Sequence, residues 1–150
     1  MESGFLLPDL DAPDGAEFWA GAARGELLVQ ACGACGRWRF PPRPMCPHCR
    51  SIDVRWDRAS GRGSIWSFVV SHPPLLPAYA ELAPYNVIVV ALEEDETIRM
   101  VGNLVTSAAG AINEIDPSTI EIGERVEVVF SKVDDVTLPR WVRAHDGPRS

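Results

Sequence analysis

The sequence predicts a mainly β protein with a short N-terminal helix, a ribbon held by four cysteines and a small five-stranded barrel. All four cysteines of the 150-residue chain lie between residues 32 and 49, and apolar residues at helical spacing precede them. After residue 60 the chain consists of short β-branched and aromatic runs between turn signals. We therefore divide it into a helical segment (1–26), a ribbon (27–55) and a barrel with a C-terminal tail (56–150).

The N-terminal helix is predicted to begin after Asp14 and to end at Gly25. Asp14 and Glu17 have the spacing of a capping box, and glycine is a common residue just past a helix end. A helix of about ten residues is not stable alone in water, so its aromatic face must pack on its own domain or on a partner subunit. Both alternatives stay open, and Phe18 and Trp19 are the candidate partner-docking residues.

The four cysteines form two Cys-x-x-Cys pairs, Cys32 with Cys35 and Cys46 with Cys49, separated by ten residues. We expect a cytoplasmic protein, because no signal peptide or run of about 18 apolar residues is present. Reduced thiols in that compartment bind metal more often than they form disulfides. The doubled spacing favours a closed tetrahedral shell around a structural Zn²⁺, with iron as a minor alternative and His48 as a spacer rather than a ligand.

A short strand is predicted at residues 27–31, where it leads into the first cysteine pair of the ribbon. The barrel strands are predicted at residues 64–71, 85–92, 97–105 and 125–133. The acidic run 93–96 turns the chain between two of them. Segment 72–84 holds four prolines and reads as a long loop, while segment 106–120 stays ambiguous. Four or five strands joined in this way favour a five-stranded OB-like barrel.

The net charge of −7 argues against a general nucleic-acid or membrane binder, since both need a positive surface. The charge is uneven, however, because eight arginines and only three acids lie between Arg24 and Arg62. The ribbon region is therefore cationic within an acidic protein.

The order of helix, ribbon and barrel resembles the DUF35 family, which pairs a rubredoxin-like zinc ribbon with an OB-fold. The resemblance extends over residues 15–140, and Arg50 departs from the glycine that often follows the last cysteine in the family. The matching motifs are Phe18-Trp19, Gly25-Glu26-Leu27, Gln30-x-Cys32-x-x-Cys35-Gly36, Phe40-Pro41-Pro42-Arg43, Cys46-Pro47-x-Cys49, Ser60-Gly61-Arg62-Gly63, Pro84-Tyr85 and Ile122-Gly123-x-x-Val126.

The resemblance implies an accessory subunit in acyl-CoA metabolism that forms a hetero-oligomer. Its partner would be a thiolase, a thiolase-like aldolase of the sterol-carrier-protein-2 type, or a MaoC-like enoyl-CoA hydratase. The residues agree with a non-catalytic role, because zinc would occupy every cysteine that thiolase chemistry could use. The chain also lacks the common hydrolase, zinc-protease and phosphate-turn motifs.

CoA or an acyl-CoA is a possible ligand of the cationic region. Its phosphate-bearing end carries about four negative charges, which arginine binds in bidentate fashion. The candidates are Arg37, Arg39, Arg43 and Arg62, with His72 facing a possible groove. For any one of them, an ordinary surface charge or partner contact is the competing interpretation.

Two competing functions remain. Zinc ribbons and OB-folds also occur in nucleic-acid-binding proteins, but the net charge and the single lysine, Lys132, disfavour that function. The other alternative is a pure scaffold that stabilises a partner and contacts no CoA.

Overall fold

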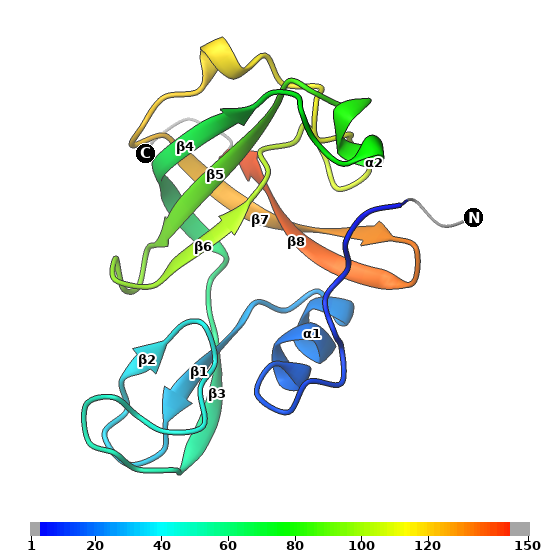
Figure 1. The fold of residues 1–150 in the computed structure, drawn as a ribbon. Coiled ribbons are helices and arrows are strands. Elements are labelled where there is room, and N and C mark those ends of the chain that lie inside the picture. The colour runs from blue at the N-terminus through cyan, green and yellow to red at the C-terminus, as the bar shows by residue number, and fades with distance from the viewer. Residues whose placement is uncertain (1–3, 145–150) are drawn as a thin grey trace.

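The computed structural model describes residues 4–144 and shows two β-sheets, with α1 packed between the ribbon and the barrel (Figure 1). This confirms the predicted fold class. The elements are α1 (Ala16–Ala23), β1 (Leu28–Cys32), β2 (Trp38–Arg39), β3 (Val54–Arg58), β4 (Arg62–Ser71), α2 (Pro77–Ala80), β5 (Tyr85–Leu92), β6 (Arg99–Gly102), η1 (Pro117–Thr119), β7 (Arg125–Val133) and β8 (Val136–Arg143).

Helix α1 ends as the sequence predicts but begins differently. Its N-cap is Gly15, and no side chain caps it, so the predicted capping box of Asp14 and Glu17 is wrong. At the other end Gly25 adopts a φ of 79°. The Gly25 N–H donates to the Ala22 carbonyl and the Glu26 N–H to the Gly21 carbonyl, which is the Schellman pattern.

The ribbon is a three-stranded antiparallel sheet in the order β2-β1-β3. All five residues of β1 are buried, and β1 is the central strand, with β2 and β3 paired along its two edges. The two flanking strands were not predicted from the sequence, because β2 has only two residues and β3 is short and largely exposed. Strand β3 crosses the proposed boundary between ribbon and barrel at residues 55 and 56. That boundary stays a proposal.

The barrel is a five-stranded antiparallel sheet in the order β6-β5-β4-β7-β8. The predicted strands 85–92 and 125–133 match β5 and β7, and the acidic run joins β5 to β6. Strand β4 pairs with both β5 and β7, with an irregularity between Ile65 and Ser67 that bends it. Strands β4 and β5 approach each other closely at Gly63. A side chain would not fit there, since a Cβ at this position would lie 2.5 Å from the Ala91 carbonyl oxygen.

The barrel is nearly closed by contacts between the segment after β6 and β8. Leu104 forms a parallel bridge with Trp141, and the Val105 N–H donates to the Trp141 carbonyl over 2.8 Å. Asn86, fully buried on β5, holds the same segment with its side-chain amide. The amide donates to the Leu104 carbonyl over 2.9 Å and accepts from the Leu104 N–H over 2.6 Å.

Strand β8 was absent from the sequence prediction, which assigned no element to most of this segment. Pro139 lies in its middle and Asp134 turns the chain before it at a φ of 54°. A proline usually argues against a strand, but an outer strand tolerates it where no ladder hydrogen bond is required. Pairing with β7 along eight residues fixes β8 in place.

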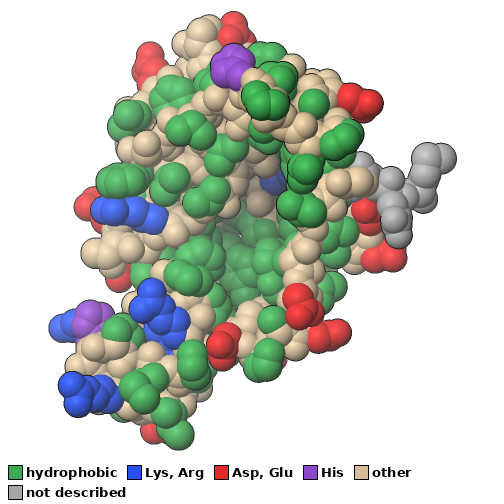
Figure 2. All heavy atoms as spheres, viewed as in Figure 1, with side chains coloured by type: hydrophobic (Ala, Val, Ile, Leu, Met, Phe, Trp, Pro, Cys, Tyr) green, Lys and Arg blue, Asp and Glu red, His purple; other side chains and the backbone are tan. Residues whose placement is uncertain are grey.

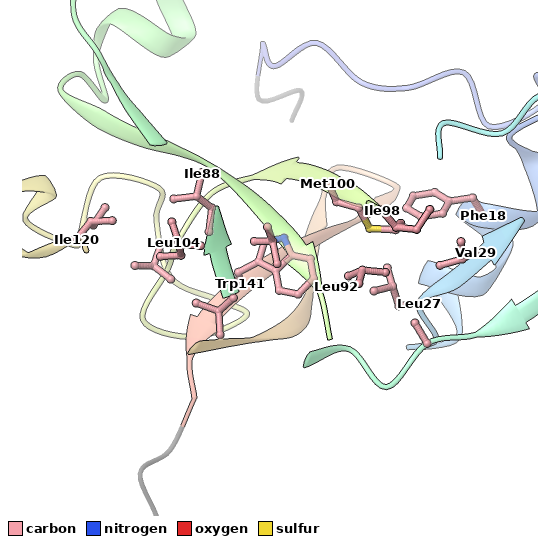
Figure 3. Packing of buried hydrophobic residues seen from close by; sticks show 14 of the residues in the cluster. Phe18, Leu27, Val29, Ile88, Leu92, Ile98, Met100, Leu104, Ile120 and Trp141 are labelled. Atoms are coloured by element: carbon pink, nitrogen blue, oxygen red, sulfur yellow. The ribbon is translucent and has the colours of Figure 1, made fainter. Parts of the chain in front are cut away.

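One hydrophobic core runs through helix, ribbon and barrel (Figure 3). Phe18 of α1 and Leu27 and Val29 of the ribbon side lie against Ile98 and Met100 of the barrel side. A smaller cluster forms where the loop 72–84 packs against Tyr85, Val105 and Ile112. Among residues 4–144, no helix is long and apolar enough to cross a membrane.

Candidate metal centre and ligand-binding surfaces

The four cysteines converge at one end of the ribbon. Their Sγ atoms all lie within 4.8 Å of one another. The Sγ–Sγ distance is 3.5 Å between Cys32 and Cys49, and 3.7 Å between Cys35 and Cys46. Four thiolates about 2.3 Å from a tetrahedral Zn²⁺ would lie about 3.8 Å apart, so the donor set fits this ion.

Backbone groups prepare the first Cys-x-x-Cys turn for a metal. The N–H groups of Ala34 and Cys35 donate to the Cys32 Sγ over 3.4 and 3.3 Å. The Cys35 N–H is the main reason why the pKa of Cys32 is lowered to about 6. Corresponding N–H groups of Cys49 and His48 lower the pKa of Cys46.

The four thiols cannot all ionise without a cation among them. At Cys49, the Ser51 N–H favours the thiolate, but the surrounding sulfurs of Cys32, Cys46 and Cys35, together with burial, raise the pKa to about 11. A divalent metal would remove this repulsion, so the electrostatics of the cluster fit a bound cation. The chain supplies four sulfur ligands, which would leave zinc no open position for a substrate.

Arg39 is buried, whereas an arginine that binds CoA is expected to be exposed. Its side chain is buried inside the ribbon, where Nε donates to Gln30 Oε1 over 2.6 Å and Nη2 donates to the Arg43 carbonyl over 3.0 Å. The same Gln30 oxygen accepts from the Arg43 N–H over 2.7 Å. Arg39 therefore positions the chain between the two cysteine pairs, and a contact with CoA stays a prediction for it.

The other CoA candidates are exposed but not gathered in one place. Arg43 and Arg37 lie on the ribbon, and Arg37 is 2.7 Å from His48 Nδ1. Arg62 opens β4 and forms an ion pair of 2.9 Å with Glu93. His72 follows the other end of this ten-residue strand. His72 and Arg62 therefore lie at opposite ends of β4.

The two candidate docking residues, Phe18 and Trp19, differ in how far they are buried. Phe18 is a core residue, 6% exposed, with its ring packed against Trp19 and Phe40. Packing within its own chain buries this ring, and a docking role for Phe18 stays a prediction. Trp19 is half-buried and remains accessible to a ligand or a partner.

Trp19 lines a hollow that sequence reasoning missed. The hollow lies between α1, the linker 40–42, β6 and β8, and has a volume of about 620 Å³. Figure 2 shows a recess walled by hydrophobic side chains in the middle of the molecule. Proline and aromatic residues in the linker and on α1 were its only sequence signal, because β8 was not predicted.

Comparison with known proteins defines the class to which this fold and metal site belong. Residues 19–55 match the family model "ChsH2, rubredoxin-like zinc ribbon domain", and residues 56–131 match "ChsH2, C-terminal OB-fold domain". Over 92% of the chain, the structure is similar to a solved chain described as "Ltp2-ChsH2(DUF35) aldolase", with 36% identity, full coverage of that chain and a TM-score of 0.78. The chain belongs to the DUF35 family of ChsH2-type zinc-ribbon and OB-fold proteins.

Relatives within this family carry two kinds of name. A "DUF35 domain-containing scaffold protein" of Methanothermobacter thermautotrophicus is 40% identical over 73% of this chain and 75% of its own length. A "Probable enoyl-CoA hydratase alpha subunit" of Thermomonospora curvata is 41% identical over 81% of this chain. The "3-oxo-4,17-pregnadiene-20-carboxyl-CoA hydratase alpha subunit" of Mycobacterium tuberculosis is 35% identical over 94%. The chain spans only 35% and 41% of the length of these two subunits.

Proposed function

We propose that this chain is a non-catalytic accessory subunit that binds and supports a thiolase-like acyl-CoA enzyme, specifically a side-chain-cleaving aldolase or a thiolase. The observation that carries the proposal is the similarity to the chain described as "Ltp2-ChsH2(DUF35) aldolase", which spans the helix, the ribbon and the barrel together. The scaffold-protein names of other relatives support the non-catalytic part.

The chemistry of the cysteine cluster supports the same proposal. Zinc held by four thiolates stabilises a fold and leaves no ligand position at which a substrate could be polarised. The backbone N–H groups and Gln30 hold the chain around the cluster, which makes the ribbon a rigid platform. A rigid platform is suited to an interface, where ordering a flexible surface would weaken binding.

A MaoC-like enoyl-CoA hydratase is the alternative partner. The names of the two hydratase alpha subunits favour it, but this chain matches only part of their length. The matched part has the ribbon and the OB-fold, so a hydratase domain in those proteins would lie outside it.

The partner is tested by tagging the full chain, purifying it from its native cells and identifying what remains bound by mass spectrometry. We expect a thiolase or aldolase in stoichiometric amount, and addition of the chain to the isolated enzyme should raise its activity. Recovery of a hydratase alone would favour the alternative. A chain that binds neither enzyme, or that has acyl-CoA activity by itself, would contradict the proposal.

We further propose that the ribbon arginines help to bind the phosphate-bearing end of CoA in the assembled complex. Arg37 and Arg43 are the residues to test, because both are exposed on the ribbon, whereas Arg39 is buried. Replacing both with glutamate should weaken CoA binding at least about tenfold, since charge-assisted hydrogen bonds are lost and repulsion is introduced. Calorimetric titration of the complex with CoA measures this change.

The matched control is Arg58→Glu on β3, an exposed arginine only 3.9 Å from Glu26 and outside the proposed set. We expect CoA affinity to be unchanged in this variant. If the Arg37→Glu/Arg43→Glu complex binds CoA normally, the chain acts as a scaffold without contacting CoA at these positions.

A further inference from the structure

The hollow between α1 and the barrel has the dimensions and the walls of a small-molecule site. Its volume of about 620 Å³ lies within the range of roughly 300–1,000 Å³ typical of such sites. Phe18, Trp19 and Phe40 contribute aromatic surface on one side, and Leu138 and Trp141 contribute apolar surface on the other. This surface lies apart from the cysteine cluster.

One buried cation lines this apolar hollow. Arg140 of β8 is 8% exposed, and its guanidinium makes no hydrogen bond or ion pair with any residue between 4 and 144. Burial lowers the pKa of Arg140, an effect that the nearby Tyr79 partly offsets, yet an arginine remains charged at neutral pH. A buried charge without a partner is costly, so an anionic group at this position would be strongly favoured.

Two other polar side chains line the hollow and have contacts within the chain. The Asn103 amide donates to the Asn86 carbonyl over 2.6 Å, and the Arg99 guanidinium lies 3.9 Å above the Trp66 ring centre. Arg140 is therefore the buried charged group of a mainly apolar wall, whereas Arg99 is exposed. This arrangement matches a ligand with a hydrocarbon body and a single carboxylate, which arginine binds through two parallel hydrogen bonds.

A peptide segment fits the hollow less well than a hydrocarbon. A bound peptide brings N–H and C=O groups that need partners when they leave water. Three of the lining residues, Pro41, Pro42 and Pro139, have no backbone N–H to donate. A hydrocarbon body needs none of these partners.

We propose that the hollow beside Arg140 is a binding site for an amphipathic carboxylic acid, with its hydrocarbon body between α1 and β8 and its carboxylate on the Arg140 guanidinium. The site is independent of the proposed CoA contacts on the ribbon. Its test therefore needs neither CoA nor a partner enzyme, and the two proposals can fail separately.

The test titrates the zinc-loaded full chain with decanoate and, separately, with decanol, which has the same chain but no charge. Indole N–H signals in nuclear magnetic resonance spectra locate the binding. We expect decanoate to shift the signals of Trp19 and Trp141, which line the hollow, and to leave Trp38 on the ribbon unaffected. Decanoate should bind about tenfold more tightly than decanol.

Substitution of the arginine tests the role of the charge. Arg140→Met should bring the affinities for decanoate and decanol together, while Arg140→Lys should retain a preference for the acid. The matched control Arg125→Met removes an exposed arginine that pairs with Glu93 and should change neither affinity.

Several outcomes would overturn the proposal. They are no saturable binding of decanoate, equal affinity of the unmodified chain for acid and alcohol, or shifts confined to tryptophans outside the hollow. Shifts of Trp19 and Trp141 on addition of a partner enzyme but not of decanoate would assign the hollow to a protein interface instead. The comparison of acid with alcohol on the unmodified chain decides the matter even if Arg140→Met does not fold.

Discussion

Residues of the same type have opposite roles in the ribbon. Arg39 is buried and hydrogen-bonded to Gln30, while Arg43, four positions later, exposes its side chain and uses only its backbone in the same network. Among the described residues, Arg39 Nη1 has no hydrogen-bond partner. The bond from Nε to Gln30 is therefore an important compensation for burying this cation.

Gln30→Leu should lower the free energy of unfolding by about 2–3 kcal/mol, because it leaves the Arg39 Nε and the Arg43 N–H without their acceptor. Gln30→Glu keeps an acceptor oxygen and should retain most of the stability. Urea denaturation of the zinc-loaded chains measures both values. Equal stability of Gln30→Leu and the unmodified chain would show that the network contributes little.

At the scale of the elements, two tight turns of the ribbon bring the sulfur atoms of the four cysteines within 4.8 Å of one another. Gly36, at a φ of 78°, ends the first turn, and the Gly33 N–H donates to the Asp53 carbonyl over 2.8 Å. This hydrogen bond connects the first cysteine turn to the segment that follows the second cysteine turn. The Cys35 N–H lowers the pKa of Cys32, while the neighbouring sulfurs and burial raise that of Cys49.

Zinc affinity should rise about tenfold per pH unit, or more steeply, between pH 7 and 8. With a pKa of about 11, Cys49 of the metal-free ribbon holds its proton in this range, and the metal must displace it. Cys32, with a pKa of about 6, is already a thiolate and adds little to the slope. Competition with a chromophoric chelator at several pH values measures the slope.

His48→Ala is the control for this titration, because His48 is an exposed spacer that contacts Arg37 rather than a proposed ligand. We expect the variant to keep both the zinc affinity and the slope. An affinity independent of pH would argue against a set of four thiolate ligands.

At the scale of the whole molecule, ribbon, helix and barrel are joined by one core. Phe18 and Val29 on one side and Ile98 and Met100 on the other belong to the same buried cluster (Figure 3). The hollow exists only because these parts pack together, with α1 on one wall and β8 on the other. Loss of the ribbon structure would therefore disturb the barrel.

Removal of zinc by a chelator should lower the melting temperature of the entire chain in a single transition. The shared core links unfolding of the metal-free ribbon to exposure of apolar barrel side chains. Differential scanning calorimetry with and without chelator measures the effect, and added zinc should reverse it. Two separate transitions, with that of the barrel unchanged, would show that the modules fold independently.

Sequence reasoning worked best where local chemistry decides the structure. The cysteine spacing predicted the cluster, Gly25 predicted the end of α1, and continuous apolar runs predicted β5 and β7. It failed at β8, whose central proline argues against a strand, and at Arg39, which looks like any other arginine in the ribbon. The position of Phe18 was open because a short aromatic helix can pack on its own chain or on another.

The sequence by itself determined the mainly β class, the order of helix, ribbon and barrel, and the four-cysteine site, because spacing and periodicity act over a few residues. Only the tertiary structure decided which arginines face solvent, where Phe18 packs and that a hollow forms beside Arg140. These features depend on contacts between segments such as α1 and β8, more than a hundred residues apart. No local pattern records such contacts, since burial is a property of the packed chain.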